Sequence, residues 1–481
     1  MPVSLARAAA FDILLRVDTT DAYASELLHS SRVAALSPAD HGLATEIVMG
    51  VLRWRSVLDE QIAAHTSQAL AKFDDEVLTA LRIGAYQLLF LDRIPAHAAI
   101  NESVELVKKA RKRSAAGMVN AVLRKINPNP SAAKAAINFG DLSAGLKAQP
   151  SETLAAPAFP QRRVTLPALS SRAQPRDLLL SRNSNAAGAH PAWLVQRWNE
   201  AYGTTAAQAI CAYDQQAPKT TIRTDAALIE ELRRDGIQVE PGKLLTHARI
   251  VTSGDVARTQ AFRERRLVIQ DEGSQLIALL VGHGHRILDC CAAPGGKTRI
   301  LAQQDPNAIV VAMEMHPHRA ALLKRLVPLP NVQVVVADAR TMPFDGNFDR
   351  ILVDAPCTGT GTLARNPDIK WRLTPDDITR LQAYQLEILT AAMRHAAPGG
   401  RILYSTCSLE PEENEGVIDN ALLTQSGFRV LALREYLEAL LHEGVLEWQD
   451  LDSLVCGPYL RTIPGVHPCD GFFGVLLERA L

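Results

Sequence analysis

The chain has 481 residues, too many for one hydrophobic core, and a prior of about 150 residues per domain gives about three domains. Hydrophobic residues make up 47% and charged residues 21% of the chain, as in an ordinary soluble globular protein. The net charge of −1 excludes an overall basic character, so any binding of nucleic acid must come from local patches.

Neither the hydropathy pattern nor the cysteines indicate a secreted or membrane protein. The sequence has no run of 18 or more apolar residues, and its N-terminus lacks an unbroken apolar core followed by a cleavage site. Seven irregularly spaced cysteines argue against a disulfide framework, and no Cys/His cluster has the spacing of a zinc site. We therefore expect a cytoplasmic protein with reduced thiols, no membrane contact and no bound metal.

Residues 1–127 are predicted to form an all-helical domain. Near the N-terminus, Ala8, Phe11, Leu14 and Leu15 recur at helical spacing, which indicates a folded amphipathic helix. In residues 75–95, apolar side chains again share one face before the helix stops at Pro95.

A third helix, over residues 101–126, is predicted to be strongly basic, with Asn101 as a possible N-cap. Such a run of charge is usually a solvated face, and the functional alternative is a surface that contacts RNA phosphates. Its basic residues are Lys108, Lys109, Arg111, Lys112, Arg113, Arg124 and Lys125.

After residue 127 the composition changes to Ala, Pro, Ser and Gly, and residues 128–189 are predicted to be a largely disordered linker. Ordered patterns resume at residue 190. Signals for helices, strands and loops then alternate up to residue 275, and they include the arginine-rich stretch "RERR" at 263–266. This length suits a small α+β module, which we expect to bind RNA.

Residues 276–481 alternate short apolar strands with helices, which predicts an α/β fold with a mainly parallel, doubly wound sheet. The predicted strands end in an acidic residue or a thiol: "RILDCC", "IVVAMEM", "VQVVVAD", "DRILVDAPC" and "GGRILYSTC". Ligands of such sheets bind beyond the carboxyl ends of the strands. All five strand ends should therefore face one crevice.

The turn "LDCCAAPGGKT" after the first of these strands is the expected cofactor site. A Walker-type nucleotide loop needs a glycine where Cys291 stands, and the pattern G-x-G-x-x-G is absent because Gly295 and Gly296 are adjacent. Small residues still let a ligand approach the helix N-terminus. Glu314 ends the second strand, where ribose hydroxyls bind, and Asp338 ends the third, where it can accept from an adenine amino group. The combination fits S-adenosylmethionine.

Two cysteines stand at neighbouring strand ends, Cys357 after the fourth strand and Cys407 after the fifth. A single cysteine of this kind is usually a small hydrophobe, but two over one crevice, beside Asp354, favour chemistry. A thiolate that adds to carbon 6 of cytosine activates carbon 5 for methylation, and Asp354 can hold the ring at N3 and the exocyclic amine. Asp354, Cys357 or a water can then remove the carbon 5 proton. These residues alone leave open which thiol attacks.

Four blocks resemble the signatures of the NOL1/NOP2/Sun family of RNA cytosine-carbon-5 methyltransferases: "DCCAAPGGKT", "VDAPCTGTGTLARNPDIKW", "YSTCSLEPEENEG" and "HPCDGFF". The resemblance covers about residues 190–481, and residues 1–127 resemble the NusB-like RNA-binding fold. That pairing is typical of the bacterial Sun/Fmu (RsmB-like) branch, which acts on 16S rRNA.

The resemblance implies a Rossmann-like class I methyltransferase domain at 276–481, with S-adenosylmethionine as cofactor. It implies that Cys407 is the nucleophile and that Cys357 acts in releasing the product. The chain departs from the family pattern at Glu314, where the family usually has aspartate. The cofactor contacts that it implies are Cys291, Ala292, Ala293, Pro294, Gly295, Gly296, Lys297, Glu314, Asp338 and Asp354.

RNA is the expected partner, and we expect a monomer that acts on 16S rRNA, either free or in a partly assembled small subunit. Aromatic side chains that can shape the base pocket are Trp371, Phe472 and Phe473, although such residues more often belong to a core. Cations that can contact phosphate are Lys297, Arg365 and Lys370.

Two alternatives remain open at this point. The catalytic blocks do not exclude a methyltransferase that acts on tRNA or on another rRNA site. The chain can also be a non-catalytic RNA-binding factor that works through its NusB-like domain. The intact set Lys297, Asp354, Cys357 and Cys407 argues against this second alternative, because a catalytically dead copy would not need it.

Overall fold

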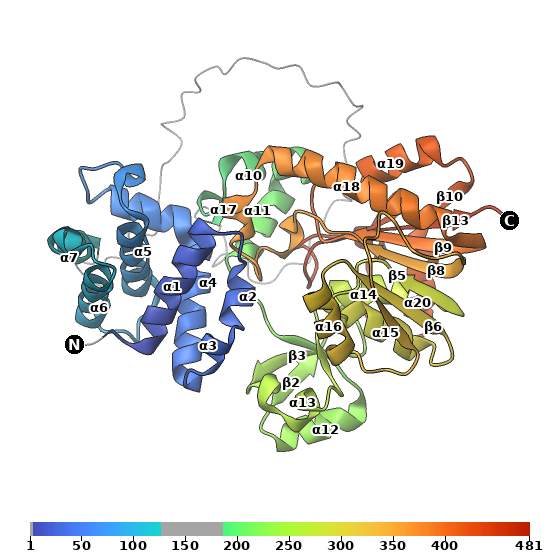
Figure 1. The fold of residues 1–481 in the computed structure, drawn as a ribbon, viewed down its shortest axis with the longest axis horizontal. Coiled ribbons are helices and arrows are strands. Elements are labelled where there is room, and N and C mark those ends of the chain that lie inside the picture. Colours follow the sequence, from blue (N-terminus) through green and yellow to red (C-terminus); the bar gives the residue numbers. More distant parts are fainter. Residues whose placement is uncertain (1–2, 127–185) are drawn as a thin grey trace, which may run out of the picture. The chain divides into compact units, whose positions relative to one another are not determined.

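The structure is a computed structural model, and it describes residues 3–126 and 186–481 (Figure 1). Within these ranges the chain forms two compact units. Residues 3–126, 186–216 and 363–372 make up the first unit, and residues 217–362 and 373–481 the second. Most of the linker predicted at 128–189 lies outside the described residues. No helix among those described is long and apolar enough to cross a membrane.

The first unit is helical, and the apolar faces of five of its helices enclose one core. In the N-terminal helix, Phe11 and Leu14 are buried as predicted, whereas Ala8 and Leu15 lie at the edge of the buried face. The helices that line this core are α1 (Leu5–Thr19), α4 (Pro38–Ala63), α5 (Asp75–Phe90), α6 (Ala96–Lys109) and α7 (Ala116–Ile126), and the short α2 (Ala24–Leu28) and α3 (Ser31–Ala34) connect α1 to α4.

The basic helix predicted over 101–126 is in fact two helices. Asn101 lies inside α6, which begins after Pro95, so the predicted N-cap is wrong. Between α6 and α7 the chain turns at Arg111, which adopts a positive φ of 65° and cannot continue an α-helix. Helix α5 ends at Phe90, five residues before the predicted stop at Pro95.

Three helices distant in sequence complete the first unit. Helices α10 (Ala192–Tyr202) and α11 (Thr204–Asp214) come from the region expected to form an α+β module, and α17 (Ile369–Arg372) comes from the predicted methyltransferase region. The domain boundaries expected from the sequence stay predictions.

Residues 363–372, which include α17, are held by the backbone of α4. Helix α4 has a kink at Trp54, where φ is −108° and ψ is 15°. Next to the kink, the carbonyl of Leu52 accepts from the Trp371 indole at 2.5 Å, and the carbonyl of Arg53 accepts from the Lys370 ammonium at 2.9 Å. The interrupted helix therefore supplies the acceptors that anchor this segment.

The second unit contains two sheets. The smaller is antiparallel, in the order β2-β3-β1-β4, and α12 (Ala226–Arg234) contributes Leu228 and Leu232 to its small core. Its strands are β1 (Thr221–Arg223), β2 (Gln238–Pro241), β3 (Ala248–Ser253) and β4 (Val268–Ile269).

The larger sheet holds all five predicted strands side by side and parallel, in the order β7-β6-β5-β8-β9. These strands are β5 (Arg286–Asp289), β6 (Ile309–Glu314), β7 (Val332–Val336), β8 (Phe348–Asp354) and β9 (Ala396–Thr406). Beyond β9, the antiparallel strand β13 (Phe472–Arg479) pairs with both β12 (Tyr459–Thr462) and β10 (Phe428–Leu431), and β11 (Val455–Cys456) forms the edge. The predicted doubly wound α/β class is confirmed.

Helices cover both faces of this sheet, which explains why its strands are almost continuously apolar. Figure 1 shows α18 (Pro375–Arg394) and α19 (Glu415–Thr424) on one face, and α14 (Glu272–Leu280), α15 (Gly296–Gln304) and α16 (Pro317–Leu326) on the other. Successive strand residues enter opposite cores: Ile287 packs with α14 and α15, and Leu288 with α18 and α19. Two packed layers thus fix the carboxyl edge of the strands.

Candidate active site

The predicted cofactor turn joins β5 to α15 at the carboxyl edge of the parallel strands. Gly295 adopts a φ of 113°, and a Cβ at this position would lie 2.5 Å from Val327 and 2.6 Å from Leu323. Only glycine fits both the backbone and the space. The turn, from Cys291 to Lys297, therefore leads directly into the N-terminus of α15, where free N–H groups favour an electron-rich ligand.

Two of the predicted cofactor acids follow the next strands of the sheet. Glu314 is the last residue of β6 and accepts from the His316 backbone at 2.9 Å, while Asp338 lies two residues beyond β7. The Arg340 guanidinium donates to Asp338 at 2.7 Å and holds the pKa of that carboxyl below its usual value. Carboxylates at consecutive strand ends suit the hydroxyls of a ribose and the amino group of an adenine, so this donor set fits S-adenosylmethionine.

The two cysteines of the fourth and fifth predicted strands are brought together. The sulfur atoms of Cys357 and Cys407 are 3.4 Å apart, and both residues are half-buried. Beside them, Asp354 accepts from Lys297 at 2.8 Å and from the Ser405 hydroxyl at 2.9 Å. The ion pair therefore joins the cofactor turn to the strand that precedes Cys357.

The surroundings of the two thiols differ in charge. The hydrogen bond to Cys407 and burial raise the pKa of Cys357 well above its usual value, and the charges of Cys407 and Glu413 add to this effect. Burial opposes the charge of Lys297, but Asp354 and Cys407 outweigh it and raise the pKa of the ammonium. Lys297 is thus a permanent cation near Cys407, whereas Cys357 keeps its proton.

Several residues that sequence reasoning missed support the thiols. Thr358 and Ser408, which directly follow the two cysteines, both hydrogen-bond the Glu413 carboxylate. Glu413 stands in the run of acids after Cys407, yet it is fully buried, and α19 begins only at Glu415. A signal was present in "EPEENEG", where an acid stands close after a strand end, but such runs are usually solvated.

Three family models match the chain: 16S rRNA methyltransferase RsmB/F at residues 276–478, the NusB family at 4–128, and the RsmF/B-like ferredoxin-like domain at 190–256. The probable ribosomal RNA small subunit methyltransferase B of Bacillus subtilis is 31% identical, and the match covers 97% of each chain. The chain belongs to the RsmB/F family of rRNA methyltransferases.

Solved structures agree with this family at the level of the fold. The crystal structure of PH0851 matches with a TM-score of 0.72 over 100% of both chains, at 22% identity. NSun6 from Pyrococcus horikoshii, solved with SFG, matches with a TM-score of 0.51 at 20% identity, over 60% of this chain and 98% of that chain. As an RsmB/F member, the chain is an S-adenosylmethionine-dependent rRNA methyltransferase with a NusB-like domain, as its motifs predicted.

One of the phosphate contacts predicted for this RsmB/F member is wrong. Lys370 is 1% exposed, its ammonium donates to the backbone of Arg53 and Ala189, and burial lowers its pKa to about 7. It cannot reach an RNA phosphate. Trp371 packs against the core of the first unit, in line with the interpretation that such aromatic residues more often belong to a core.

The aromatic pair in "DGFF" also serves mainly as core. Phe473 is fully buried and Phe472 is 5% exposed, which confirms the alternative that such residues more often pack than bind. The Phe472 ring nevertheless lies 5.2 Å from the Lys297 ammonium and so supports its position.

The basic patches are partly neutralised within the chain. Lys108 pairs with Glu105 at 2.7 Å and Lys112 with Asp74 at 3.1 Å, while Lys109, Arg113 and Arg124 are exposed to solvent. In "RERR", Arg266 is engaged by Glu231 and Glu264. Contact of these patches with RNA stays a prediction.

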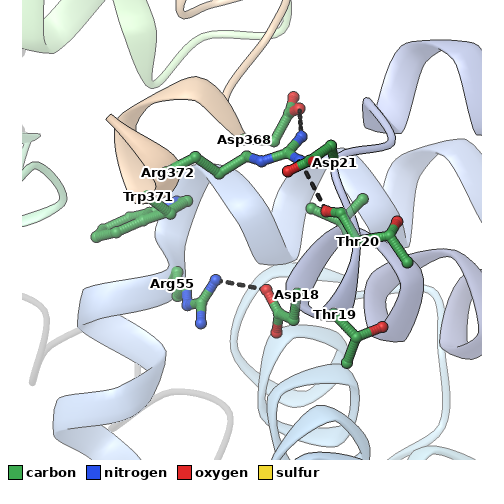
Figure 2. A pocket seen from close by; sticks show the side chains of 9 residues that line it. Asp18, Thr19, Thr20, Asp21, Arg55, Asp368, Trp371 and Arg372 are labelled. Atoms are coloured by element: carbon green, nitrogen blue, oxygen red, sulfur yellow. Dashed lines mark hydrogen bonds and ion pairs between the residues drawn. The ribbon is translucent and has the colours of Figure 1, made fainter. Parts of the chain in front are cut away.

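A polar pocket of about 460 Å³ lies in the first unit, lined by the Asp18–Asp21 turn, Arg55, Asp368 and the end of α17 (Figure 2). Its two guanidinium groups are already engaged: Arg55 donates to Asp18 at 2.7 Å, and Arg372 donates to the carbonyls of Thr20 and Ala22. The pocket therefore has the chemistry of an anchor for residues 363–372 rather than that of a ligand site.

Proposed function

We propose that this enzyme methylates carbon 5 of a cytosine in 16S rRNA through a covalent adduct with Cys407. The observation that carries this proposal is the pair of sulfur atoms 3.4 Å apart beside the Lys297–Asp354 ion pair. A single thiol suffices to attack a base, and a second one at this distance is useful only if a later step needs it. S-adenosylmethionine, when bound, supplies an electrophilic methyl group.

Cys407 begins the reaction as the nucleophile. Its sulfur lies 3.4 Å from the sulfur of Cys357 and near the Lys297 cation, and it attacks the base as a thiolate. The thiolate forms a bond to carbon 6, and the electron pair of the 5,6 double bond makes carbon 5 nucleophilic enough to take up a methyl group. In this proposal Asp354 holds the polar edge of the cytosine during the addition.

Cys357 then acts as the base that ends the reaction. While Cys407 is free, its sulfur raises the pKa of Cys357 by hydrogen bonding and by charge. Once Cys407 is bound to carbon 6 as a neutral thioether, both effects disappear and Cys357 loses its proton more readily. A Cys357 thiolate can remove the carbon 5 proton, after which the carbon 6–sulfur bond breaks, Cys407 leaves as a thiolate and the double bond re-forms.

The roles of the two thiols can be separated by trapping. We expect Cys357→Ala, incubated with S-adenosylmethionine and 16S rRNA, to accumulate a protein–RNA adduct that survives denaturation. Cys407→Ala should give neither adduct nor product, and bisulfite sequencing of the rRNA names the base. An adduct formed by Cys407→Ala would reverse the two assignments.

The cytosines of 16S rRNA are preferred over tRNA because the Bacillus subtilis relative is named for the small ribosomal subunit. The arrangement of Lys297, Asp354 and the two thiols favours an active enzyme over a non-catalytic RNA-binding factor. Methylation of tRNA but not of 16S rRNA by the purified protein would overturn the choice of substrate.

A further inference from the structure

Glu413 is a fully buried carboxylate close to both thiols, in a position where the proposed reaction does not use it. A buried acid is unfavourable unless donors surround it, so its presence needs an explanation. We infer that Glu413 is a positioning residue, which ties the loop carrying Cys357 to the loop carrying Cys407 and so sets the spacing of the two sulfur atoms. This inference rests on the proposed function.

The carboxylate contacts the neighbour of each cysteine. Its Oε1 accepts from the Thr358 backbone N–H at 2.9 Å, and its Oε2 accepts from the Thr358 hydroxyl at 2.5 Å and from the Ser408 hydroxyl. Thr358 directly follows Cys357 and Ser408 directly follows Cys407. One side chain therefore joins the two loops one residue away from each sulfur.

The remaining contacts fix Glu413 itself and the other side of the Cys357 loop. Gln385, on α18, donates to Glu413 Oε1 at 2.8 Å and to the carbonyl of Pro356 at 2.9 Å. The Tyr404 hydroxyl donates to the Glu413 carbonyl at 2.6 Å. Residues 356–358 are thus held on both sides of Cys357, and the clamp is anchored to both β9 and α18.

The hydrogen-bond pattern shows which property of Glu413 matters. Oε1 faces two N–H groups that can only donate, whereas Oε2 faces two hydroxyls that can donate or accept. A glutamine can place its oxygen toward the N–H groups and its amide toward the hydroxyls, and so preserve the clamp without its charge. An alanine removes the carboxylate from all four donors, so that Gln385 keeps only its bond to Pro356 and the hydroxyls of Thr358 and Ser408 keep only their bond to each other, which no longer ties Gln385 to either loop neighbour of the cysteines.

The test measures single-turnover methyl transfer by the full-length protein on 16S rRNA. We expect Glu413→Ala to lower the rate about 100-fold, whereas Glu413→Gln stays within about tenfold of the wild type. The KM for RNA should stay unchanged in both variants. The Kd for S-adenosylmethionine, which calorimetry measures, should stay unchanged as well. Glu443→Ala, at an exposed glutamate of the same unit, is the matched control.

A Glu413→Ala protein that turns over as fast as Glu413→Gln would overturn the inference. If Glu413→Ala does not fold, Thr358→Val is the second variant, because it removes one hydroxyl of the clamp at nearly constant volume. Thr358→Val should lower kcat and leave KM unchanged. A kcat equal to that of the wild type in Thr358→Val would also reject the clamp. Adduct trapping by Cys357→Ala separates the two proposals. If Cys357→Ala forms the adduct and Glu413→Ala is fully active, only the clamp is rejected. If Cys357→Ala forms no adduct, the proposed function is rejected.

Discussion

Gly361 offers a sharp test of how the thiol loops are packed. Its N–H donates to the carbonyl of Cys407 at 2.9 Å, and its carbonyl accepts from the N–H of Gly471 at 2.7 Å. A Cβ at this position would lie 2.8 Å from two backbone carbons of Gly471 and closer still to its oxygen. Since the obstacle is the backbone of Gly471, Gly361→Ala must push these two backbone segments apart rather than turn a side chain aside.

The expected loss follows from these contacts. Two backbone hydrogen bonds contribute about 1 kcal/mol each, and overpacking a close contact costs about 1–3 kcal/mol. Gly361→Ala should therefore destabilise this region by about 3–5 kcal/mol. The carbonyl of Cys407 moves with the loop, so single-turnover methyl transfer should also fall by about 100-fold.

Hydrogen–deuterium exchange of peptides that cover 355–365 and 404–410 measures this loss locally, which matters because a chain of several domains need not unfold in one step. Gly427→Ala is the matched control: no atom lies within 4 Å of a Cβ there, and its exchange and activity should equal those of the wild type. Equal protection in Gly361→Ala and Gly427→Ala would refute the packing described for these loops.

Three further predictions concern other parts of the chain. Burial raises the pKa of Asp289 to about 7, above its unfolded value of about 3.9, so the stability it contributes is present below pH 4 and is lost as the pH rises to 7. Denaturant titrations at a series of pH values measure the free energy of unfolding. Between pH 4 and pH 7 this free energy should fall by about 2–4 kcal/mol less in Asp289→Asn than in the wild type. The same pH dependence in both proteins would contradict the raised pKa. Glu314→Gln should weaken S-adenosylmethionine binding by about 10–100-fold in calorimetry, and an unchanged Kd would remove Glu314 from the site. Trp371→Phe keeps an aromatic ring but loses the hydrogen bond to the carbonyl of Leu52. Hydrogen–deuterium exchange in residues 50–56 should therefore show a local stability lower by about 1 kcal/mol. Protection equal to that of the wild type would show that the indole N–H contributes nothing.

The parallel strands were predictable because each is a short apolar run bounded by a turn, and burial on both faces makes that run continuous. Glu314 ends β6 as expected, and the Rossmann-like order follows from alternation with helices. The antiparallel strands β10 to β13 were not predicted. Their place depends on pairing with β9 through β13, a contact between distant residues that no local pattern records.

The acidic stretch after Cys407 shows a second feature that the sequence alone does not predict, namely which acid of a run is buried. Glu413 and Glu415 stand two residues apart in one run of acids, yet the first is fully buried against Thr358 and Gln385, while the second pairs with Arg461. Charge runs usually lie in solvent, and only the donors of other elements decide which member turns inward. The two thiols themselves were predictable, because they follow strands that are neighbours in a parallel sheet.

Residues 363–372 show how a short segment can pack away from its neighbours in the sequence. They follow the loop of Cys357 directly in the chain, but they belong to the compact unit of the NusB-like helices. Lys370 and Trp371 donate to carbonyls beside the kink of α4, which no sequence pattern signals because a kink without proline depends on packing. A protein cut at the boundary near residue 190 would retain these donors and lose their acceptors on α4. Since buried donors without acceptors are costly, the helical domain is a structural requirement for the segment next to the loop of Cys357, in addition to any role in holding RNA.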